Sequence, residues 1–388
     1  MFSNVQKVYI AGYGLTKVGE HWDKSLETLM AESALKALDY TGLSRVDEIC
    51  VSNVYGEVLQ EQLVLGSVLA EELGVSGVPA VRVEAGAASG AAAIRYAVNA
   101  IQSGITNVVL VCGGEKLTDG TQEESLSLLS MDERYEVAGE IGSHFFSTAA
   151  LLYRMYMRRY DVKQDGIASF SVISHENAST VQHAQYPFKI GLENVLNSPY
   201  VAEPLHRLET TAQADGAAAL VLCSENIARK LDSPKVLVSG IHLATDFPNP
   251  FDREDPLHIQ SLAASTSSLL SMRGISRGEV SFIELFDAAS ILAALSLESS
   301  GFIPRGKSGE AAMSGRLSLN GELPINTFGG LKARGHPVGA TPIYQVAEAY
   351  LQLTRQAGKN QLDNVRFGLV ESLAGFGSSS VSILLEEV

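Results

Sequence analysis

The sequence predicts an α/β fold, a five-layered α-β-α-β-α sandwich of two similar halves with a loop domain inserted into the first half. Two observations predict this fold. Apolar strand-like runs alternate with helical segments, and the valine-rich runs lack the polar alternation of a sheet with one exposed face, so they are typical of strands covered by helices on both faces. The same order of runs also occurs twice, with a period of roughly half the chain. Two such halves can share one central helical layer, which gives five layers.

The repeat is visible in four pairs of segments with similar patterns of apolar and small residues. The pairs are 7–12 with 235–240, 43–52 with 275–284, 107–114 with 364–371, and 215–223 with 377–385. Between the strands we expect helices over 25–40, 91–103 and 342–356, the second of which ends at Gly104, a residue that commonly terminates helices.

Residues 117–204 interrupt the first half before its last strand. They include Met131-Asp-Glu-Arg-Tyr135, many aromatic residues and few strand signals. Long insertions of this kind often form substrate-binding lids, so we expect an inserted loop domain here. The expected division is a first half over 1–116 and 205–230, the loop domain over 117–204, and a second half over 231–388.

The composition excludes several classes of protein. The 388 residues carry a net charge of −15 and contain no basic run, which argues against general nucleic-acid binding. Cys50, Cys112 and Cys223 lie in apolar strand-like runs with no metal-site spacing, so we expect buried free thiols. No signal-peptide pattern or membrane-length apolar run is present, and we expect a cytoplasmic protein.

The first segment with a chemical signature is residues 83–95, where a short strand runs into six small residues and then a helix. Small residues permit a sharp turn, and Ala87 at its tip would stand at a helix N-terminus. Free backbone N–H groups and the helix dipole favour an anion at such a position. The alternative is that these small residues serve only close packing between helices.

The second segment is residues 326–341, a glycine-rich turn that places His336 before Pro337 and the start of a helix. A histidine held rigidly at such a place is suited to proton transfer or to hydrogen bonding with an oxyanion. A single histidine is more often structural, but the glycines around this one and its matching place in the second repeat favour a functional role.

Several of these segments resemble one known family. Residues 329–341, Gly-Gly-Leu-Lys-Ala-Arg-Gly-His-Pro-Val-Gly-Ala-Thr, resemble the C-terminal signature of thiolases, with most similarity to the sterol-carrier-protein-type and archaeal acetyl-CoA acyltransferases. Residues 83–90 resemble the thiolase nucleophile segment. Residues 113–119, 194–204 and 215–219 fit as well, so the resemblance covers essentially the whole chain. It implies acyl-CoA as the substrate, no metal and no covalently bound cofactor.

In that family a cysteine attacks the thioester, and the histidine of the Gly-His-Pro motif deprotonates it. By resemblance His336 is this histidine, but Ala87 stands at the cysteine position and Phe286 at the histidine of the family's His-Asp-(Cys/Ala)-Phe motif. The late Cys-x-Gly motif of classical thiolases falls on 373–375 without a cysteine. The residues that the resemblance implies for contact with CoA are Ser89, Gly90, Gly329, Gly330 and Gly375.

Alanine has no lone pair, so Ala87 cannot form an acyl-enzyme. Either a cysteine has been replaced by engineering or the natural chain is not a thiolase in mechanism, and the first explanation does not account for Phe286. Three functions stay open: an acyltransferase that is inactive as written, a non-catalytic CoA-binding or scaffolding subunit, and a retro-aldol carbon–carbon lyase acting on an acyl-CoA. Lyases of this kind rely on tyrosines, whereas the corresponding positions here look like Phe286 and His336.

The resemblance also implies partners. Related proteins form homodimers or tetramers that bury a strand edge. They also associate with a small OB-fold, zinc-ribbon protein and sometimes with a 3-hydroxy-3-methylglutaryl-CoA synthase. We expect the loop domain to contribute basic residues to CoA binding, with Arg154, Arg158, Arg159 and Lys189 as candidates.

Overall fold

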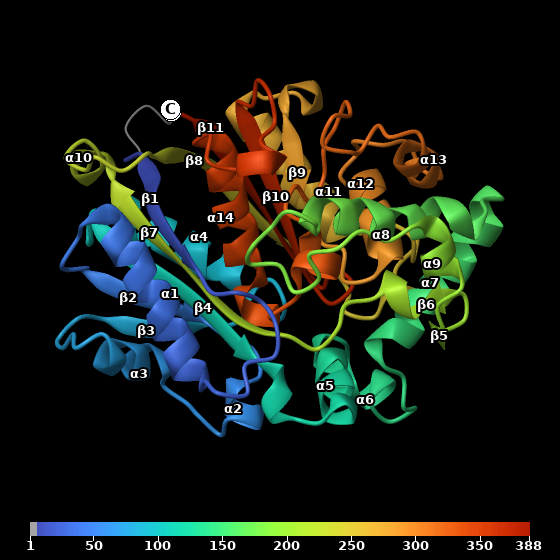
Figure 1. The fold of residues 1–388 in the computed structure, drawn as a ribbon, viewed down its shortest axis with the longest axis horizontal. Helices are drawn as coiled ribbons and strands as arrows, with labels where there is room; N and C mark the ends of the chain where they lie inside the picture. The colour runs from blue at the N-terminus through green and yellow to red at the C-terminus, as the bar shows by residue number, and fades with distance from the viewer. Residues whose placement is uncertain (1–5) are drawn as a thin grey trace.

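The structure is a computed structural model that describes residues 6–388 (Figure 1). The first half contains β1 (Val8–Leu15), α1 (Leu26–Thr41), β2 (Glu48–Ser52), α2 (Gly56–Leu59), α3 (Leu65–Glu72), β3 (Ala80–Val83), α4 (Ser89–Gln102), β4 (Val108–Lys116), β7 (Asp215–Ser224) and α10 (Glu225–Ala228). The second half contains β8 (Val236–Thr245), α11 (Gln260–Arg273), β9 (Phe282–Glu284), α12 (Ser290–Ser299), α13 (Ser308–Met313), α14 (Thr341–Leu353), β10 (Phe367–Ala374) and β11 (Ser379–Glu387).

The strands form one sheet in the order β3-β2-β4-β7-β1-β8-β11-β10-β9. The two halves meet at β1 and β8, which are joined only through the pairs Tyr9–Leu237 and Ile10–Val236. On either side of this junction the strands of the repeat occupy equivalent places: β1 and β8, β7 and β11, β4 and β10, β2 and β9. The duplication predicted from the sequence is therefore present in the sheet.

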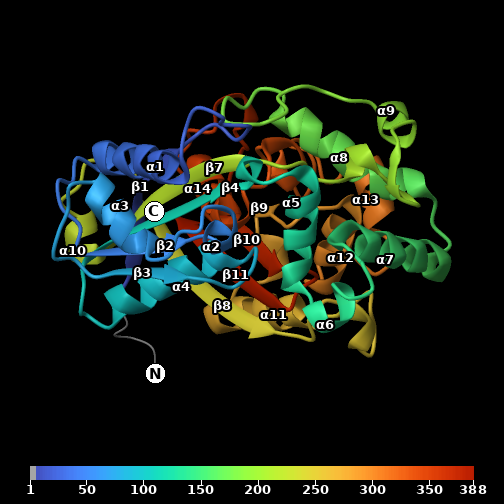
Figure 2. The same ribbon diagram turned by 90° about the horizontal axis from the view of Figure 1, so that it is seen from below.

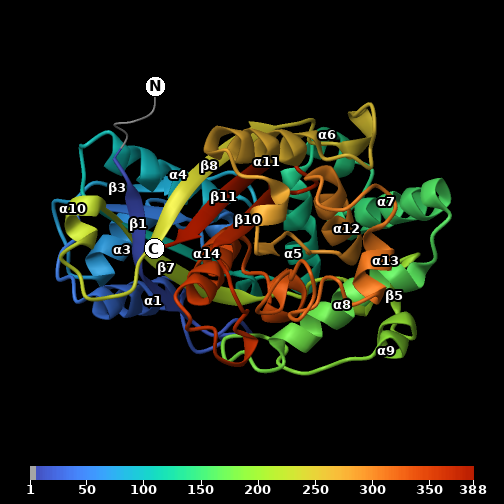
Figure 3. The same cartoon turned by 90° about the horizontal axis from the view of Figure 1, so that it is seen from above.

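Helices cover both faces of each half-sheet. In Figure 1, α4 and α14 lie between the two half-sheets, and their apolar residues share one buried cluster with the inward faces of both. Figure 2 shows α1 and α3 on the other side of the first half-sheet. Figure 3 shows α11 alongside β8 and β11 of the second half-sheet. This order of layers is the predicted five-layered sandwich.

The expected helices form, with small shifts at their ends. Ser25 caps α1 by accepting a hydrogen bond from the Thr28 N–H at 3.2 Å, and Gly42 ends the helix in the left-handed conformation. The second helix begins at Ser89, two residues before the expected start. The helix after the glycine-rich turn ends at Leu353, three residues earlier than expected.

The segment from 117 to 204 is mostly helical. It contains α5 (Gln122–Leu128), α6 (Tyr135–Ala138), α7 (Phe145–Tyr160), α8 (Gln164–Ala178), α9 (Leu192–Leu196) and β5 (Tyr200–Ala202), which pairs with β6 (Leu205–His206). Although it departs from the first half, α7 and α8 contact α12 of the second half, as Figure 1 also shows. The segment therefore covers the end of the molecule where the turns that carry Ala87 and His336 meet.

Among the described residues, none of the helices combines the length and the apolar character needed to cross a membrane.

Candidate functional site

Four of the residues singled out in the sequence come together at one place. Ala87, Phe286, His336 and Gly375 line a small space of about 10 Å³. They come from the β3–α4 turn, the loop after β9, the turn before α14 and the turn after β10. The equivalent ends of the two repeats thus meet over the central helices and build one site.

Ala87 occupies a tight turn at the start of α4. Gly86 has a φ of 55°, which favours glycine. The Ser89 hydroxyl donates to the Gly86 carbonyl at 2.6 Å and accepts from the Ala85 N–H at 2.8 Å. The turn is therefore fixed by its own backbone and by Ser89, and it points the N–H of Ala87 into the site.

Asp132 approaches this turn from the inserted segment, and sequence reasoning missed its role. Asp132 is a half-buried residue whose carboxylate points inward: its Oδ2 accepts the Gly375 N–H at 2.8 Å and the Ala87 N–H at 3.3 Å. A Cβ on Gly86 would lie 2.5 Å from Asp132 Oδ1, and one on Gly375 would lie 2.9 Å from its Cβ. The two glycines thus leave the space that the aspartate fills.

The surroundings of Asp132 raise the pKa of its carboxyl group. Burial raises the pKa of Asp132 to about 6, although its two backbone donors oppose the shift. The Tyr55 hydroxyl has no hydrogen-bond partner among residues 6–388, and burial, followed by the charge of Asp132, raises its pKa. A carboxyl group that titrates near neutrality is suited to acid–base chemistry.

His336 forms the opposite wall of the same space. Its Nδ1 is 2.8 Å from the Thr341 hydroxyl, which fixes the ring. Burial, and next the charge of Arg334, lowers the pKa of His336 to about 3, so the imidazole is neutral. A neutral imidazole can donate a hydrogen bond from Nε2 when Thr341 donates to Nδ1.

Buried polar contacts anchor the glycine-rich turn that carries His336. Residues Gly330–Arg334 form a π-helical turn. Asp287 accepts from the Leu331 N–H at 2.6 Å and from the Ser174 hydroxyl at 2.9 Å. Arg334 forms a fully buried ion pair with Glu348 at 3.1 Å. These contacts hold the turn rigid whatever stands at position 87.

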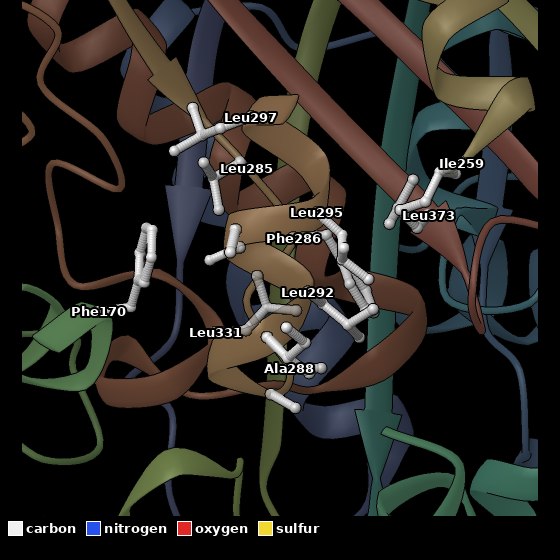
Figure 4. Close-up of a cluster of buried hydrophobic side chains, with 14 of the residues drawn as sticks. Phe170, Ile259, Leu285, Phe286, Ala288, Leu292, Leu295, Leu297, Leu331 and Leu373 are labelled. Atoms are coloured by element: carbon white, nitrogen blue, oxygen red, sulfur yellow. The ribbon is translucent and has the colours of Figure 1, made fainter. Parts of the chain in front are cut away.

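Phe286 supplies an apolar wall. Its ring meets His336 edge-on, with ring centroids 5.6 Å apart and an interplanar angle of 90°. Figure 4 shows the phenyl ring among Leu292, Leu295 and Ala288, within the largest buried cluster. This side of the site therefore offers no hydrogen bond to a reacting oxygen.

A larger cavity of about 540 Å³ adjoins this space, and His336 and Thr211 line both. Its walls come from the inserted segment and from the core. Its lining includes His175, Tyr186, Arg207 and Lys332. A cavity of this size next to a reactive centre is typical of a small-molecule site.

Four of the five residues expected to contact CoA lie in tightly packed turns. A Cβ on Gly90 would lie 2.9 Å from the Gly339 carbonyl oxygen, and one on Gly329 would lie 2.5 Å from the Ala178 Cβ. A Cβ on Gly330 would lie 2.3 Å from Asn326 Nδ2. The Ser89 hydroxyl is hydrogen-bonded within its own turn. Of the five residues expected to contact CoA, only Gly375 lines either space.

The expected basic residues also lie elsewhere. Arg154 is 3.9 Å from Glu203, and Arg159 and Lys189 pair with Asp255 and Glu176. With Arg158, these side chains line neither space. The lysine and arginine that line the larger cavity are instead Lys332 and Arg207, whose role was not predicted from the sequence.

Cys50, Cys112 and Cys223 are buried free thiols, as expected from the sequence. Burial raises the pKa of each to about 12, so none is a thiolate at neutral pH. None lines the space around Ala87. Across residues 6–388, no cluster of three His, Cys, Asp or Glu side chains is arranged to hold a metal ion.

Comparison with known proteins identifies matches that span nearly the whole chain. The family described as "Thiolase, N-terminal domain" matches residues 8–226, and "Thiolase C-terminal domain-like" matches 244–387. An acetyl-CoA acetyltransferase of Methanothermobacter thermautotrophicus is 34% identical and covers 97% of this chain and 98% of its own. Sterol carrier protein 2 of Gallus gallus is 27% identical and covers 98% of this chain and 71% of its own.

Solved structures show the same fold. The Ltp2-ChsH2(DUF35) aldolase has a TM-score of 0.85 at 24% identity and covers 98% of each chain. Human mitochondrial 3-ketoacyl-CoA thiolase in complex with CoA has a TM-score of 0.78 at 16% identity and covers 99% of this chain and 98% of its own.

Proposed function

The chain belongs to the thiolase family, and from this premise we propose that it binds acyl-CoA thioesters and cleaves or forms a carbon–carbon bond beside the thioester without an acyl-enzyme. The observation that carries the proposal is the Asp132 carboxylate, bound across the backbone N–H groups of Ala87 and Gly375 and lining the same space as a neutral His336. The site thus combines a base with a hydrogen-bond donor and lacks a nucleophile.

Acyl transfer of the acetyltransferase type is the function of the relatives by name, and it is not the function we propose for this chain as written. That reaction needs a group at position 87 that can carry the acyl residue. Ala87 cannot carry it, and the three cysteines are buried thiols away from the site.

A retro-aldol cleavage of a 3-hydroxyacyl-CoA fits the groups that are present. Asp132 takes the proton of the 3-hydroxyl group, the C2–C3 bond breaks, and C3 becomes the carbonyl carbon of an aldehyde or ketone. The electron pair of the broken bond passes to C2 and the thioester oxygen as an enolate. His336 Nε2–H donates to that oxygen, and the proton held by Asp132 returns to C2, which releases an acyl-CoA.

We place the acyl group and the adjoining end of the pantetheine arm in the 540 Å³ cavity between the inserted segment 117–204 and the core. Two features support this: the cavity joins the Ala87 site through His336, and its walls include both regions. The solved Ltp2-ChsH2(DUF35) aldolase motivates two further parts of the proposal, the lyase reaction and association with a partner protein.

A non-catalytic acyl-CoA-binding subunit is the second candidate. It is favoured by the small volume beside Ala87, about 10 Å³, and by the apolar wall of Phe286. In this case Asp132 would only accept the two N–H hydrogen bonds and hold the turns together, and another chain would carry out catalysis.

Turnover of a 3-hydroxyacyl-CoA by the purified chain distinguishes these candidates. We expect release of an aldehyde or ketone together with an acyl-CoA, followed by mass spectrometry and a carbonyl reagent. Asp132→Asn keeps an oxygen for the two N–H donors but removes the base, so we expect kcat to fall roughly 10²–10⁴-fold. The exposed Asp363→Asn is the matched control and should leave kcat unchanged.

Tight acyl-CoA binding without turnover, in the presence and absence of a partner protein, would favour the non-catalytic subunit. Absence of acyl-CoA binding by calorimetry would contradict both candidates.

A further inference from the structure

Lys332 is a nearly buried lysine without a partner. The residue is 5% exposed, and no hydrogen bond or ion pair reaches its ammonium group from residues 6–388. Lys116, which is 4% exposed, shows the usual arrangement: its ammonium lies 2.9 Å from Asp119, 3.0 Å from the Thr118 hydroxyl and 3.5 Å from Asp215. A buried charge without a partner is costly, so the bare ammonium of Lys332 indicates that an anion completes it.

The immediate surroundings of Lys332 supply no such anion. The Tyr186 ring lies on one side, with its centroid 5.6 Å from the ammonium. Asp287 is the carboxylate that acts on Lys332, but its oxygens accept hydrogen bonds from Leu331 and Ser174. Burial, opposed by Asp287, lowers the pKa of Lys332 to about 8, which leaves the amine mostly protonated at neutral pH.

The free side of Lys332 faces the 540 Å³ cavity, which Arg207 also lines. Arg207 is exposed and makes no ion pair within the described part of the chain. Its positive charge contributes to lowering the pKa of Lys332. The carboxylate of Glu20 lies on the wall of the same cavity, where it accepts from the Trp22 indole N–H at 3.3 Å. In a chain of net charge −15, two cations without an ion pair outnumber the single carboxylate on this cavity wall, which favours binding of an anion there.

We propose that Lys332, assisted by Arg207, binds a carboxylate at the far end of the acyl group, so that the substrates are CoA thioesters of dicarboxylic acids. This inference rests on the proposed acyl-CoA-binding function and names its substrate class. Lysine binds such a group as a point charge, and arginine adds directed N–H donors.

The position of Lys332 favours the acyl group over the phosphates of CoA as the source of the anion. Lys332 precedes His336 by four residues, and a chain of four residues spans at most ~14 Å even when extended. Both residues line the same cavity. An anion at Lys332 is therefore near the reacting carbonyl, whereas the entire pantetheine arm separates the thioester from the phosphates.

Binding of four thioesters tests the proposal without requiring turnover. Succinyl-CoA and butyryl-CoA differ by a carboxylate, and succinyl-pantetheine and butyryl-pantetheine differ in the same way without any phosphate. By calorimetry we expect the succinyl thioester to bind at least ~10-fold more tightly in both pairs, because the carboxylate adds a charge-assisted contact. Lys332→Met should bring both ratios close to one.

Arg207→Gln changes an exposed residue and gives a second variant that does not depend on refolding around a buried site. We expect it to reduce the succinyl preference severalfold, whereas Lys230→Met on the distant α10 side should leave it unchanged. Equal affinities of succinyl and butyryl thioesters for the unmodified chain would overturn the proposal. A second contrary result would be a Lys332→Met variant that loses affinity for both CoA thioesters but not for the pantetheine thioesters. That result would assign Lys332 to the phosphates. Failure of the lyase reaction leaves this binding measurement intact, so the two proposals fail separately.

Discussion

Asp132 and Ala87 together define what the site can do. The N-terminus of α4 and the turn at Gly375 present two N–H groups that favour negative charge, and in this chain a carboxylate from the inserted segment supplies it. A carboxylate held there can accept a proton, whereas the methyl group of Ala87 can neither accept a proton nor carry an acyl group. The loss of the nucleophile and the presence of Asp132 therefore belong to one chemical arrangement.

This arrangement predicts the outcome of restoring a cysteine. In Ala87→Cys the thiolate would form beside the Asp132 carboxylate, which opposes its ionisation, and Phe286 would offer no donor to the thioester oxygen. We expect no acetylated protein by intact-mass spectrometry after incubation with acetyl-CoA. Ala87→Cys combined with Phe286→His should form the acetyl-enzyme, and adding His336→Ala should abolish it. Efficient acetylation of the single Ala87→Cys variant would contradict this account of Asp132 and Phe286.

At the scale of elements, the sequence predicted what depends on local pattern. The apolar runs and their repetition predicted the strands of both halves. The small-residue and glycine-rich turns predicted Ala87 and His336 near helix starts, and the structure places Ala87 two residues before α4 and His336 five residues before α14. Asp132 could not be assigned this way, because its contacts join residues 45 and 243 positions apart in the sequence. Lys332 was read only as part of a motif, since its lack of a partner is visible only in three dimensions.

The strand β3 is the element most exposed to association. It ends the sheet beyond β2, and all four of its residues are only partly buried. The Pro79 carbonyl accepts from the Ile49 N–H at 2.9 Å, so strand alternation directs the N–H groups of Ala80 and Arg82 to the open edge. Open edges of this kind are normally covered.

We therefore expect a two-fold dimer formed through β3. Light scattering should give at least twice the 41.4 kDa of one chain at micromolar concentration. Ala80→Pro removes an outward N–H and spares the bonds to β2, so it should shift the chain toward monomer while circular dichroism shows the fold unchanged. A monomeric unmodified chain would rule out this interface.

At the scale of the whole molecule, the fold holds several carboxyl groups out of water. Burial raises the pKa of Glu115, Glu133 and Glu371 to about 7. Glu371 lies on β10 away from the site. Its Oε1 accepts from the Thr266 hydroxyl at 2.9 Å, and its Oε2 has no partner among the described residues. Stability should therefore respond to pH across the neutral range in a way that the net charge alone does not explain.

Glu371→Gln isolates this effect. The pKa of Glu371 rises from 4.5 to about 7 on folding, so between these pH values the folded protein holds a proton that the unfolded chain releases. The stabilisation linked to this proton is fully present below about pH 4.5 and is lost as the pH rises through about 7. Glutamine mimics the protonated group at every pH.

We therefore expect the melting temperature of Glu371→Gln, relative to the unmodified chain, to increase from pH 5 to pH 8. The corresponding change in the free energy of unfolding should be at most ~3 kcal/mol, because one pKa unit corresponds to ~1.4 kcal/mol. The exposed Glu72→Gln on α3 should show no such trend in the same calorimetric scans. A constant difference between Glu371→Gln and the unmodified chain across this range would show that Glu371 keeps its ordinary pKa in the fold.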